Sequence, residues 1–341
     1  MKKLLLFICA AALLVSCLTA CESKPVFTIY NWEDYISTEV LEDFRALHPE
    51  VEVVYENFTT NEDMYTKLKN GGGDYDVIIP SDYIIEKLIN EGLLAEIDYD
   101  NVPNYQYISD FCKDLDFDPE NKYTVPYMWG TLGIIYDSEV VKEDEITWDV
   151  LFGGKYKTIM MKSIRDAMGA ALAACGNSIN SEESEKIEKA KDLLIEQKNQ
   201  ENFYGYGFDD IKDKMVRGEA EAALIYSGDA MYSISQNPNL KYAVPAEGSN
   251  KWFDAMVIPA TSKNKALAEE FINFMCETEN AKKNAEHNGF YTAQGKAADV
   301  IAEETGVAYP DISTLENCEI FKMFEDSILE LYNKAWTEIF A

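Results

Sequence analysis

The sequence is poor in basic residues, in histidine and, beyond its N-terminus, in long apolar runs. It has 30 Lys and Arg against 61 Asp and Glu, a formal net charge of −31 among 341 residues. Such an excess of negative charge repels nucleic acid and anionic membrane surfaces, so no nucleic-acid partner is expected. The two histidines, His48 and His287, are isolated, so neither a zinc site nor a Ser-His-Asp hydrolase triad is expected. No apolar stretch after the first 21 residues is long enough to span a bilayer.

Cysteine is scarce after position 21 and shows no metal-binding pattern. The four later cysteines are Cys112, Cys175, Cys276 and Cys318. Their wide spacing does not match a paired metal motif, and it does not indicate which of them would pair in an exported protein. Buried free thiols are the expected state, and neither a metal nor any other cofactor is expected.

The N-terminus has the pattern of an export signal. Lys2 and Lys3 precede an apolar run that ends in Leu-Thr-Ala before Cys21, and polar residues begin directly after it. Small residues before a cysteine are similar to the bacterial lipobox, so residues 1–20 are predicted to be a lipoprotein signal peptide and Cys21 the lipidated residue. Cys17 fits nearly as well, and a cleaved signal without lipid is the remaining alternative. A lipid anchor would hold the exported chain at the membrane, on the periplasmic or outer face, without spanning it.

The mature chain alternates strand-like and helix-like segments. Three short apolar or β-branched runs each precede an amphipathic segment, which favours an α/β fold with a parallel sheet covered by helices. The glycine run 71–73 precedes a strand and lacks a following Lys-Ser or Lys-Thr, so it is predicted to end a helix rather than to bind phosphate. The expected order is strand 26–30, helix 38–48, strand 51–56, helix 61–70, strand 75–80 and helix 81–92.

Aromatic and polar side chains follow two of these strands at the point where each ends. The stretch "NWEDY" contains Trp32 and Tyr35, and "PSDYI" contains Ser81 and Tyr83. In open α/β sheets, ligands bind beyond the carboxyl ends of the strands. These four side chains are therefore expected to face one crevice.

The second half of the chain repeats the combination of an aromatic residue with an acid. From about Tyr127 the chain is expected to cross into a second unit. A strand that ends at Tyr226 is followed by Ser-Gly-Asp. Further on, Trp252 and Asp254 are two residues apart, so that they share one face if the segment is extended.

Six segments, taken in order, resemble the bacterial polyamine-binding proteins, the spermidine/putrescine receptors of ABC importers. The resemblance runs from about Val26 to the C-terminus. It implies a two-lobed periplasmic-binding-protein type II fold that closes on its ligand at a hinge, with residues 25–130 plus 253–297 in one lobe and residues 131–252 plus 298–341 in the other. The segments are "YNWEDYI", "YDVIIPSDY", "YTVPYMWGTLGIIYD", "RDAMG", "GEAEAALIYSGDA" and "NKWFDAMVIPATSKN".

The resemblance also implies which residues hold the ligand. The positions that match the ligand-binding residues of the family are Trp32, Tyr35, Ser81, Tyr83, Asp166, Tyr226, Trp252 and Asp254. At three places the chain departs from the family pattern. Ser163 stands where spermidine receptors often have an acid, Phe290 or Tyr291 takes the place of a usual tyrosine, and Glu319 takes the place of a glutamine.

These residue types suit a polyamine, a hydrocarbon chain that carries charged nitrogens. Removing water from an ammonium group is costly, so carboxylates must replace the lost hydration. Asp254 and Asp166 are predicted to do this, while the aromatic rings cover the methylenes and add cation–π attraction. Asp166 could instead cap its helix or pair with Arg165, and the aromatics could be ordinary packing residues.

The predicted function is a monomeric, non-catalytic receptor that delivers a polyamine to an ABC permease. One alternative is a receptor of the same fold for another small cationic or polar solute. A secreted carboxylate-pair hydrolase is less favoured, because no pair of acids in unequal environments is evident in the sequence. A surface adhesin remains a further alternative.

Overall fold

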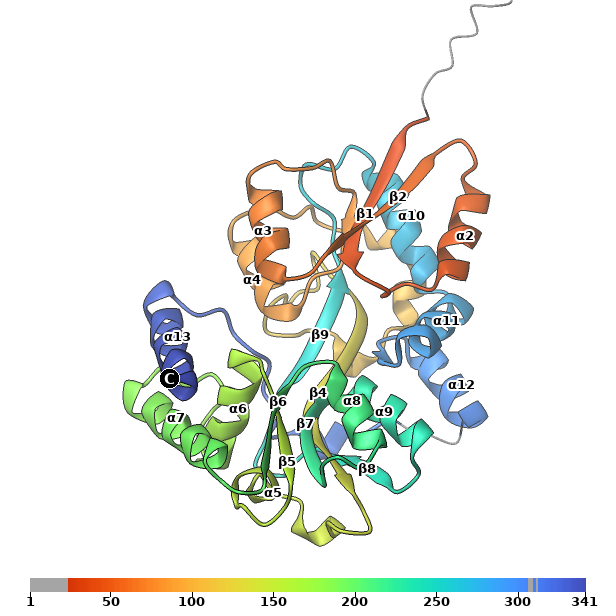
Figure 1. The fold of residues 1–341 in the computed structure, drawn as a ribbon. Coiled ribbons are helices and arrows are strands. Elements are labelled where there is room, and N and C mark those ends of the chain that lie inside the picture. The colour runs from red at the N-terminus through yellow and green to blue at the C-terminus, as the bar shows by residue number, and fades with distance from the viewer. Residues whose placement is uncertain (1–23, 306–308, 311) are drawn as a thin grey trace, which may run out of the picture.

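The protein consists of two α/β lobes that lie one above the other in Figure 1. The structure, a computed structural model, describes residues 24–305, 309–310 and 312–341. The predicted signal peptide and both candidate lipidation cysteines lie outside the described residues. Of the described residues, none belongs to a helix that is both long and apolar enough to cross a bilayer.

The N-terminal lobe contains a parallel sheet with the order β2-β1-β3. Its strands are β1 (Val26–Trp32), β2 (Glu52–Phe58) and β3 (Val77–Ile78). Three early helices alternate with the strands, as the sequence predicts, and three later helices return to the same lobe. They are α2 (Thr38–Leu47), α3 (Asn61–Lys69), α4 (Asp82–Asn90), α10 (Lys265–Met275), α11 (Thr278–Asn288) and α12 (Gly295–Thr305).

A second sheet follows the order β10-β4-β7-β5-β6, with β8 and β9 also paired to β4. β5, β6 and β7 are parallel to one another, whereas β4 is antiparallel to its partners β7, β8, β9 and β10. The strands are β4 (Val125–Asp137), β5 (Thr158–Met161), β6 (Phe203–Gly207), β7 (Ala222–Tyr226), β8 (Leu240–Ala243), β9 (Lys251–Met256) and β10 (Tyr291–Thr292).

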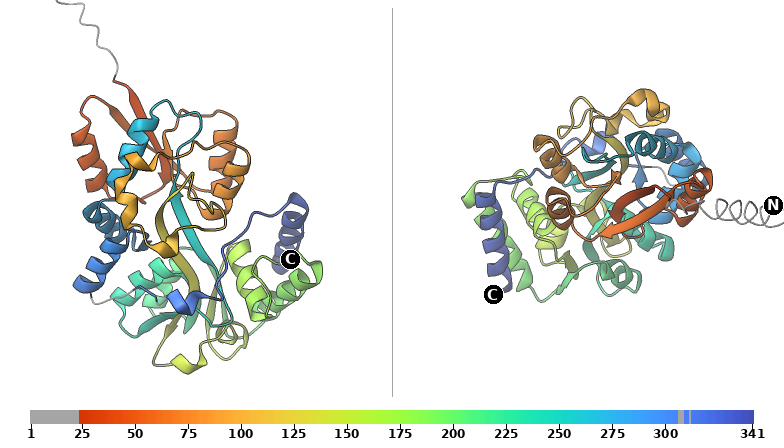
Figure 2. Two further views of the ribbon diagram at one scale, coloured as in Figure 1. Left: turned by 180° about the vertical axis from the view of Figure 1, so that it is seen from behind. Right: turned by 90° about the horizontal axis from the view of Figure 1, so that it is seen from above.

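Helices cover the second lobe, and the C-terminal helix α13 packs beside α6 and α7 (Figure 2). These helices are α5 (Asp149–Phe152), α6 (Ile164–Ala174), α7 (Ser184–Lys198), α8 (Asp210–Val216), α9 (Ser227–Gln236) and α13 (Asp326–Phe340). The two-lobed α/β class predicted from the sequence is confirmed, and the second sheet adds antiparallel pairs to the expected parallel ones.

Each lobe has its own hydrophobic core, and strand β4 contributes to both. Trp129 is buried in the first core, whereas Leu132, three residues later, is buried in the second. β9 runs antiparallel beside the first half of β4, and Asn250 forms a bridge with Glu319, so several segments connect the lobes. The domain boundaries predicted from the sequence stay a prediction.

The cysteines and acidic groups of the described chain hold no evident metal site. Cys112, Cys276 and Cys318 are buried and Cys175 is exposed, and all four are free thiols. Free thiols were expected, but burial of Cys175 was not found. No cluster of three or more His, Cys, Asp or Glu in the described part of the chain is arranged to hold a metal ion.

Candidate ligand-binding cleft

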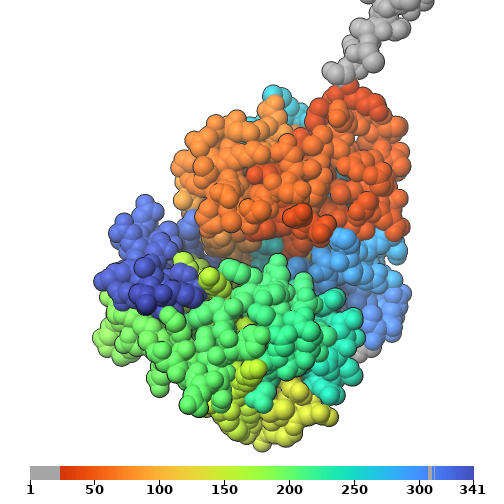
Figure 3. Space-filling model, viewed as in Figure 1, coloured from red at the N-terminus to blue at the C-terminus, as the bar shows by residue number. Residues whose placement is uncertain are grey.

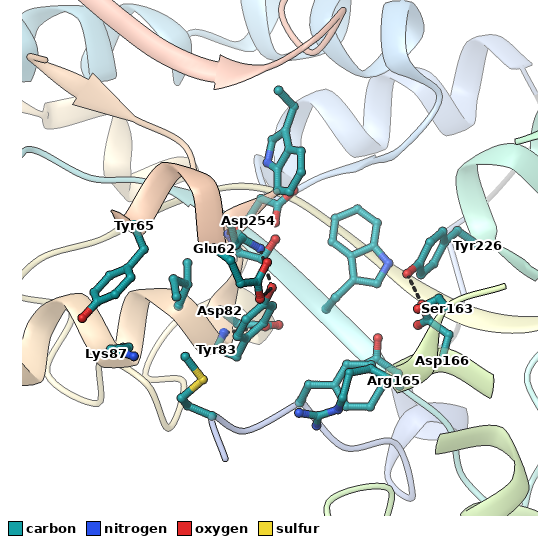
Figure 4. A pocket seen from close by; sticks show the side chains of 18 of the residues that line it. Glu62, Tyr65, Asp82, Tyr83, Lys87, Ser163, Arg165, Asp166, Tyr226 and Asp254 are labelled. Carbon is teal, nitrogen blue, oxygen red and sulfur yellow. Dashed lines mark hydrogen bonds between the residues drawn. The ribbon is translucent and has the colours of Figure 1, made fainter. Parts of the chain in front are cut away.

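A cavity of about 810 Å³ lies between the lobes and is lined by residues of both. Figure 3 shows the furrow between the orange N-terminal lobe and the green second lobe, with α13 at one end. Figure 4 shows the cavity from close by, with Asp254, Asp82, Tyr83 and Glu62 on one side and Asp166, Tyr226, Ser163 and Arg165 on the other.

The turn after β1 brings two aromatic residues to the cavity. Asp34 has φ 51°, in the left-handed region that aspartate tolerates, and so turns the chain sharply between Trp32 and Tyr35. The hydroxyl of Tyr127 donates a 2.6 Å hydrogen bond to the carbonyl oxygen of Tyr35 and fixes the turn. The sequence "NWEDY" therefore presents both rings at the end of a strand, as predicted.

The N-terminal lobe supplies the acid Asp254, which lies on β9. Its Oδ2 accepts a 2.6 Å hydrogen bond from the hydroxyl of Tyr35, whereas its Oδ1 has no partner although the residue is only 6% exposed. Burial raises the pKa of Asp254 to about 6, against the opposite effect of hydrogen bonds from Tyr35 and Ser81. Asp254 therefore lines the cavity with one carboxylate oxygen that has no hydrogen-bond partner.

The second lobe supplies Asp166 in the same manner, from the first turn of α6. Its Oδ2 accepts a 2.7 Å hydrogen bond from the hydroxyl of Tyr226, and its Oδ1 has no partner, with the residue 4% exposed. Burial raises the pKa of Asp166 above its usual value, while hydrogen bonds from Ser163 and Tyr226 and the charge of Arg165 act to lower it. The two lobes therefore carry equivalent acid–tyrosine pairs.

Aromatic rings line the space between these acids. The ring of Trp252 meets Phe290 edge-on at 5.1 Å and Tyr226 at 6.3 Å between ring centroids. Trp252 lies against β4 at Gly130, where a Cβ atom would come within 2.5 Å of the indole. The indole N–H groups of Trp32 and Trp252 have no partner among the described residues.

Most of the predicted site residues meet at this cavity, and two do not. Tyr291 pairs with Trp129 in the sheet, and the backbone N–H of Ile179 donates to a Glu319 carboxylate oxygen that also lies outside the cavity. The predicted residues that line the cavity are Trp32, Tyr35, Ser81, Tyr83, Ser163, Asp166, Tyr226, Trp252, Asp254 and Phe290.

The cavity also contains charged residues that the sequence analysis did not select. Glu62, at 3.0 Å from the donating hydroxyl of Tyr83, lines the N-terminal side with Asp82. The guanidinium of Arg165 lies 4.0 Å from the ring centroid of Phe324 and lines the opposite side. Asp82 and Arg165 each stand directly beside a predicted site residue, and that adjacency was the only signal in the sequence.

The cavity has the features of a solute-binding cleft. Two α/β lobes enclose it, aromatic rings line it, and each lobe adds one acid with an unpartnered carboxylate oxygen to its lining. Such a cleft between domains is a typical place for a small-molecule site. The fold and the cleft together define a two-lobed solute-binding protein.

The chain belongs to the family of bacterial extracellular solute-binding proteins. The family model described as "Bacterial extracellular solute-binding protein" matches residues 39–314. The chain is 30% identical over 328 residues to the spermidine/putrescine-binding periplasmic protein of Salmonella typhimurium, with 94% of this chain and 93% of that protein covered. The resemblance predicted from the motifs is confirmed.

Solved structures have the same architecture. The spermidine/putrescine substrate-binding protein PotD of Streptococcus pneumoniae is 37% identical, with a TM-score of 0.82 and coverage of 92% of this chain and 98% of that one. The TpPotD lipoprotein of Treponema pallidum is 26% identical, with a TM-score of 0.80 and coverage of 92% and 99%.

Proposed function

We propose that the protein is a non-catalytic, extracytoplasmic receptor that binds a linear polyamine such as putrescine or spermidine and delivers it to an ABC import permease. The curated relatives and the solved relative from Streptococcus pneumoniae bear the names of spermidine/putrescine-binding proteins, which supports this ligand class. The relatives are named as binding proteins, which supports a receptor rather than an enzyme.

One observation carries the proposal: each lobe contributes to the lining of the same aromatic cavity one acid that has a buried carboxylate oxygen without a hydrogen-bond partner. Asp254 Oδ1 and Asp166 Oδ1 are these atoms. An unpaired buried charge is strongly unfavourable, so a ligand that pairs with both acids is stabilised relative to water in the cavity. A hydrocarbon ligand with an ammonium group near each end can pair with the acid of each lobe at the same time.

The remaining cavity residues suit the hydrocarbon part of such a ligand. Trp32, Tyr35, Tyr226, Trp252 and Phe290 supply ring faces and edges along the cavity. Methylene groups gain by leaving water for these rings, and an ammonium over a ring face adds about 0.5–2 kcal/mol. We infer that Ser81 and Tyr83 orient one end of the ligand with their hydroxyl groups.

We also propose that Cys21 carries a lipid that tethers the receptor, as a monomer, to the outer face of the cytoplasmic membrane or within the periplasm. The motif before Cys21 supports this, and the relative from Treponema pallidum is described as a lipoprotein. Globomycin-sensitive processing, followed by mass spectrometry of the N-terminal peptide, distinguishes a lipidated Cys21 from a lipidated Cys17 and from a simple cleaved signal.

Native mass spectrometry of the purified protein, followed by calorimetry with putrescine and spermidine, tests the proposed ligand. Asp254→Asn and Asp166→Asn each remove one charge-assisted hydrogen bond, which contributes about 1.5–3 kcal/mol. Each variant is therefore expected to bind the polyamine about 10- to 100-fold more weakly. A folded protein that shows no heat with either amine contradicts the proposal.

Asp118→Asn is the matched control for both variants. Asp118 is also a buried aspartate, and it accepts hydrogen bonds from the backbone N–H groups of Lys122 and Tyr123, away from the cavity. Its replacement is expected to lower stability and to leave the affinity for putrescine unchanged. An equal loss of affinity in all three variants would mean that general destabilisation, not charge pairing, causes the effect.

A further inference from the structure

Asp82 is a second buried acid at the wall of the cavity on the N-terminal side, and the proposed function assigns it no role. It is the first residue of α4, follows Ser81 directly, and is 2% exposed. Figure 4 shows it close to Asp254 and Tyr83 on the N-terminal side of the cavity. A buried acid requires hydrogen-bond partners, and the partners of Asp82 belong to two different segments of the cavity wall.

Both oxygens of Asp82 accept hydrogen bonds from backbone groups of cavity-forming segments. Oδ1 accepts from the N–H of Tyr83 at 2.7 Å, and Oδ2 accepts from the N–H of Phe253 at 3.0 Å. Phe253 lies between Trp252 and Asp254 on β9. The side chain therefore ties the start of α4 to the strand that carries the principal acid of this lobe.

The backbone brings Asp82 and Asp254 together independently of their side chains. Ser81 and Asp254 are paired in an antiparallel bridge, so that Asp82 lies one residue from the partner of Asp254. Both acids line the cavity, and Asp254 Oδ1 is buried without any partner. The unpartnered oxygen of Asp254 can accept a hydrogen bond from a ligand, so the two acids lie at the proposed ligand site.

We propose that Asp82 and Asp254 act as a proton-linked pair, in which Asp82 positions Asp254 and the arrival of a ligand ammonium group displaces a proton from the pair to the solvent. The inference rests on the proposed function. In the free protein the pair holds a proton because both acids are buried at the same wall of the cavity, where two charged carboxylates are unfavourable. A bound ammonium supplies the missing positive charge and releases that proton.

The groups around Asp82 define the balance between its two protonation states. Burial raises the pKa of Asp82 to about 8, and the charge of Asp254 on β9 adds to this effect. The N–H groups of Phe253 and Tyr83 and the more distant Arg165 on α6 favour the charged form. Glu62 on α3, hydrogen-bonded to the hydroxyl of Tyr83, adds a further negative charge on this side.

The affinity for the ligand is expected to depend on pH, because binding releases the proton of the acid pair. Alkylammonium groups stay protonated below pH 9, as lysine does, so the ligand charge is constant in the relevant range. Because the ligand prefers the deprotonated pair, its affinity rises with pH wherever the free protein still holds the proton. Because burial raises the pKa of Asp82 to about 8, the rise in affinity due to Asp82 is expected below about pH 8.

Calorimetric titration of the wild-type chain with putrescine tests this, at pH 6, 7 and 8 and, at pH 7.5, in phosphate and in Tris. We expect the affinity to rise about five- to tenfold from pH 6 to pH 8, since a shift of one pKa unit is worth a factor of ten. The apparent binding enthalpy should differ between the two buffers because the released proton is taken up by the buffer. Equal enthalpies in both buffers together with a flat pH profile would overturn the proposal.

Asp82→Asn distinguishes proton linkage from a purely structural role. The variant is expected to bind putrescine more weakly and to lose both the rise between pH 6 and 8 and most of the buffer dependence. Asp118→Asn, the buried control, should keep both. A folded Asp82→Asn protein with the wild-type pH profile contradicts the proposal, and if this variant does not fold, the wild-type buffer comparison decides alone.

The same titrations separate this inference from the function on which it rests. Absence of putrescine and spermidine binding at every pH would refute the proposed function itself. Binding that is strong, independent of pH and free of proton release would refute only the linkage.

Discussion

At the residue scale, the cleft contains two acids that each have one carboxylate oxygen without a hydrogen-bond partner. Asp254 and Asp166 each hold one oxygen on a tyrosine hydroxyl of their own lobe and leave the other oxygen without a partner. The tyrosine fixes the orientation of the carboxylate, and the free oxygen retains the capacity to bind a cation. Because the carboxylate is already held in place, less conformational entropy is lost when the ligand binds.

Gly130 leaves space at the cleft for the indole of Trp252, so a larger residue at this position should displace the ring. In Gly130→Ala, the new Cβ atom would lie 2.5 Å from Trp252 Cζ2 and 2.9 Å from Ser227 Oγ, so the indole must move. We expect putrescine to bind about tenfold more weakly, a loss of about 1.4 kcal/mol, and the tryptophan fluorescence of the free protein to change.

Gly295→Ala is the control for this prediction. The nearest atom to its new Cβ would be the carbonyl oxygen of Tyr107 at 3.5 Å, an ordinary contact. It should bind putrescine as the wild type does. If Gly130→Ala retains full affinity, Trp252 does not contact the ligand in the way described.

At the element scale, the segment 319–324, which precedes α13, is hydrogen-bonded to the second lobe beside the cleft. The side chain of Glu319 accepts hydrogen bonds from Ser178 Oγ and from the N–H of Ile179, and Arg165 donates to the carbonyl oxygen of Lys322. The guanidinium of Arg165 also stacks on Phe324. Glu319, which the sequence predicts as a candidate ligand residue, therefore forms hydrogen bonds within the second lobe and does not line the cavity.

Glu319→Gln tests this assignment. The substitution weakens charge-assisted hydrogen bonds in a partly buried place, so the free energy of unfolding should fall by about 1–3 kcal/mol in urea titration. The affinity for putrescine should stay within about threefold of the wild type. Glu316→Gln, exposed on the same segment, should change neither quantity. A large loss of affinity with unchanged stability would instead make Glu319 a ligand residue.

The local elements could be predicted from the sequence because their signals are local. The predicted helix that follows "VIIP" begins at Asp82 with Ser81 at its N-cap, and the glycine run ends α3, with Gly71 at φ 66°. The strand-end positions of Trp32 and Tyr35 follow from the same alternation of strands and helices. These features depend on residues that are close together in the chain.

Other features of the cleft depend on contacts between distant segments and could not be predicted. The choice between Phe290 and Tyr291 depends on the register of the short strand β10, because a shift of one residue reverses which side chain faces the cavity. Asp82 is stabilised in its buried position because the N–H of Phe253, 171 residues later in the chain, donates a hydrogen bond to its carboxylate. No local pattern carries that information.

At the scale of the whole molecule, two separate cores are joined by segments that pass the cleft. β4 contributes to both cores, and β9 pairs with its first half. A ligand that contacts Asp254 in one lobe and Asp166 in the other stabilises the arrangement in which the lobes approach each other. A solute with only one charged end would engage one lobe and would give a smaller stabilisation of that state.

The most direct test of this account is a calorimetric comparison of three solutes of equal chain length: 1,4-diaminobutane, 1-aminobutane and 1,4-butanediol. The diamine should bind most tightly, the monoamine about 10- to 100-fold more weakly because one acid stays unpaired, and the diol not measurably. Binding of the diol as tight as that of the diamine would show that paired charge across the two lobes does not determine recognition.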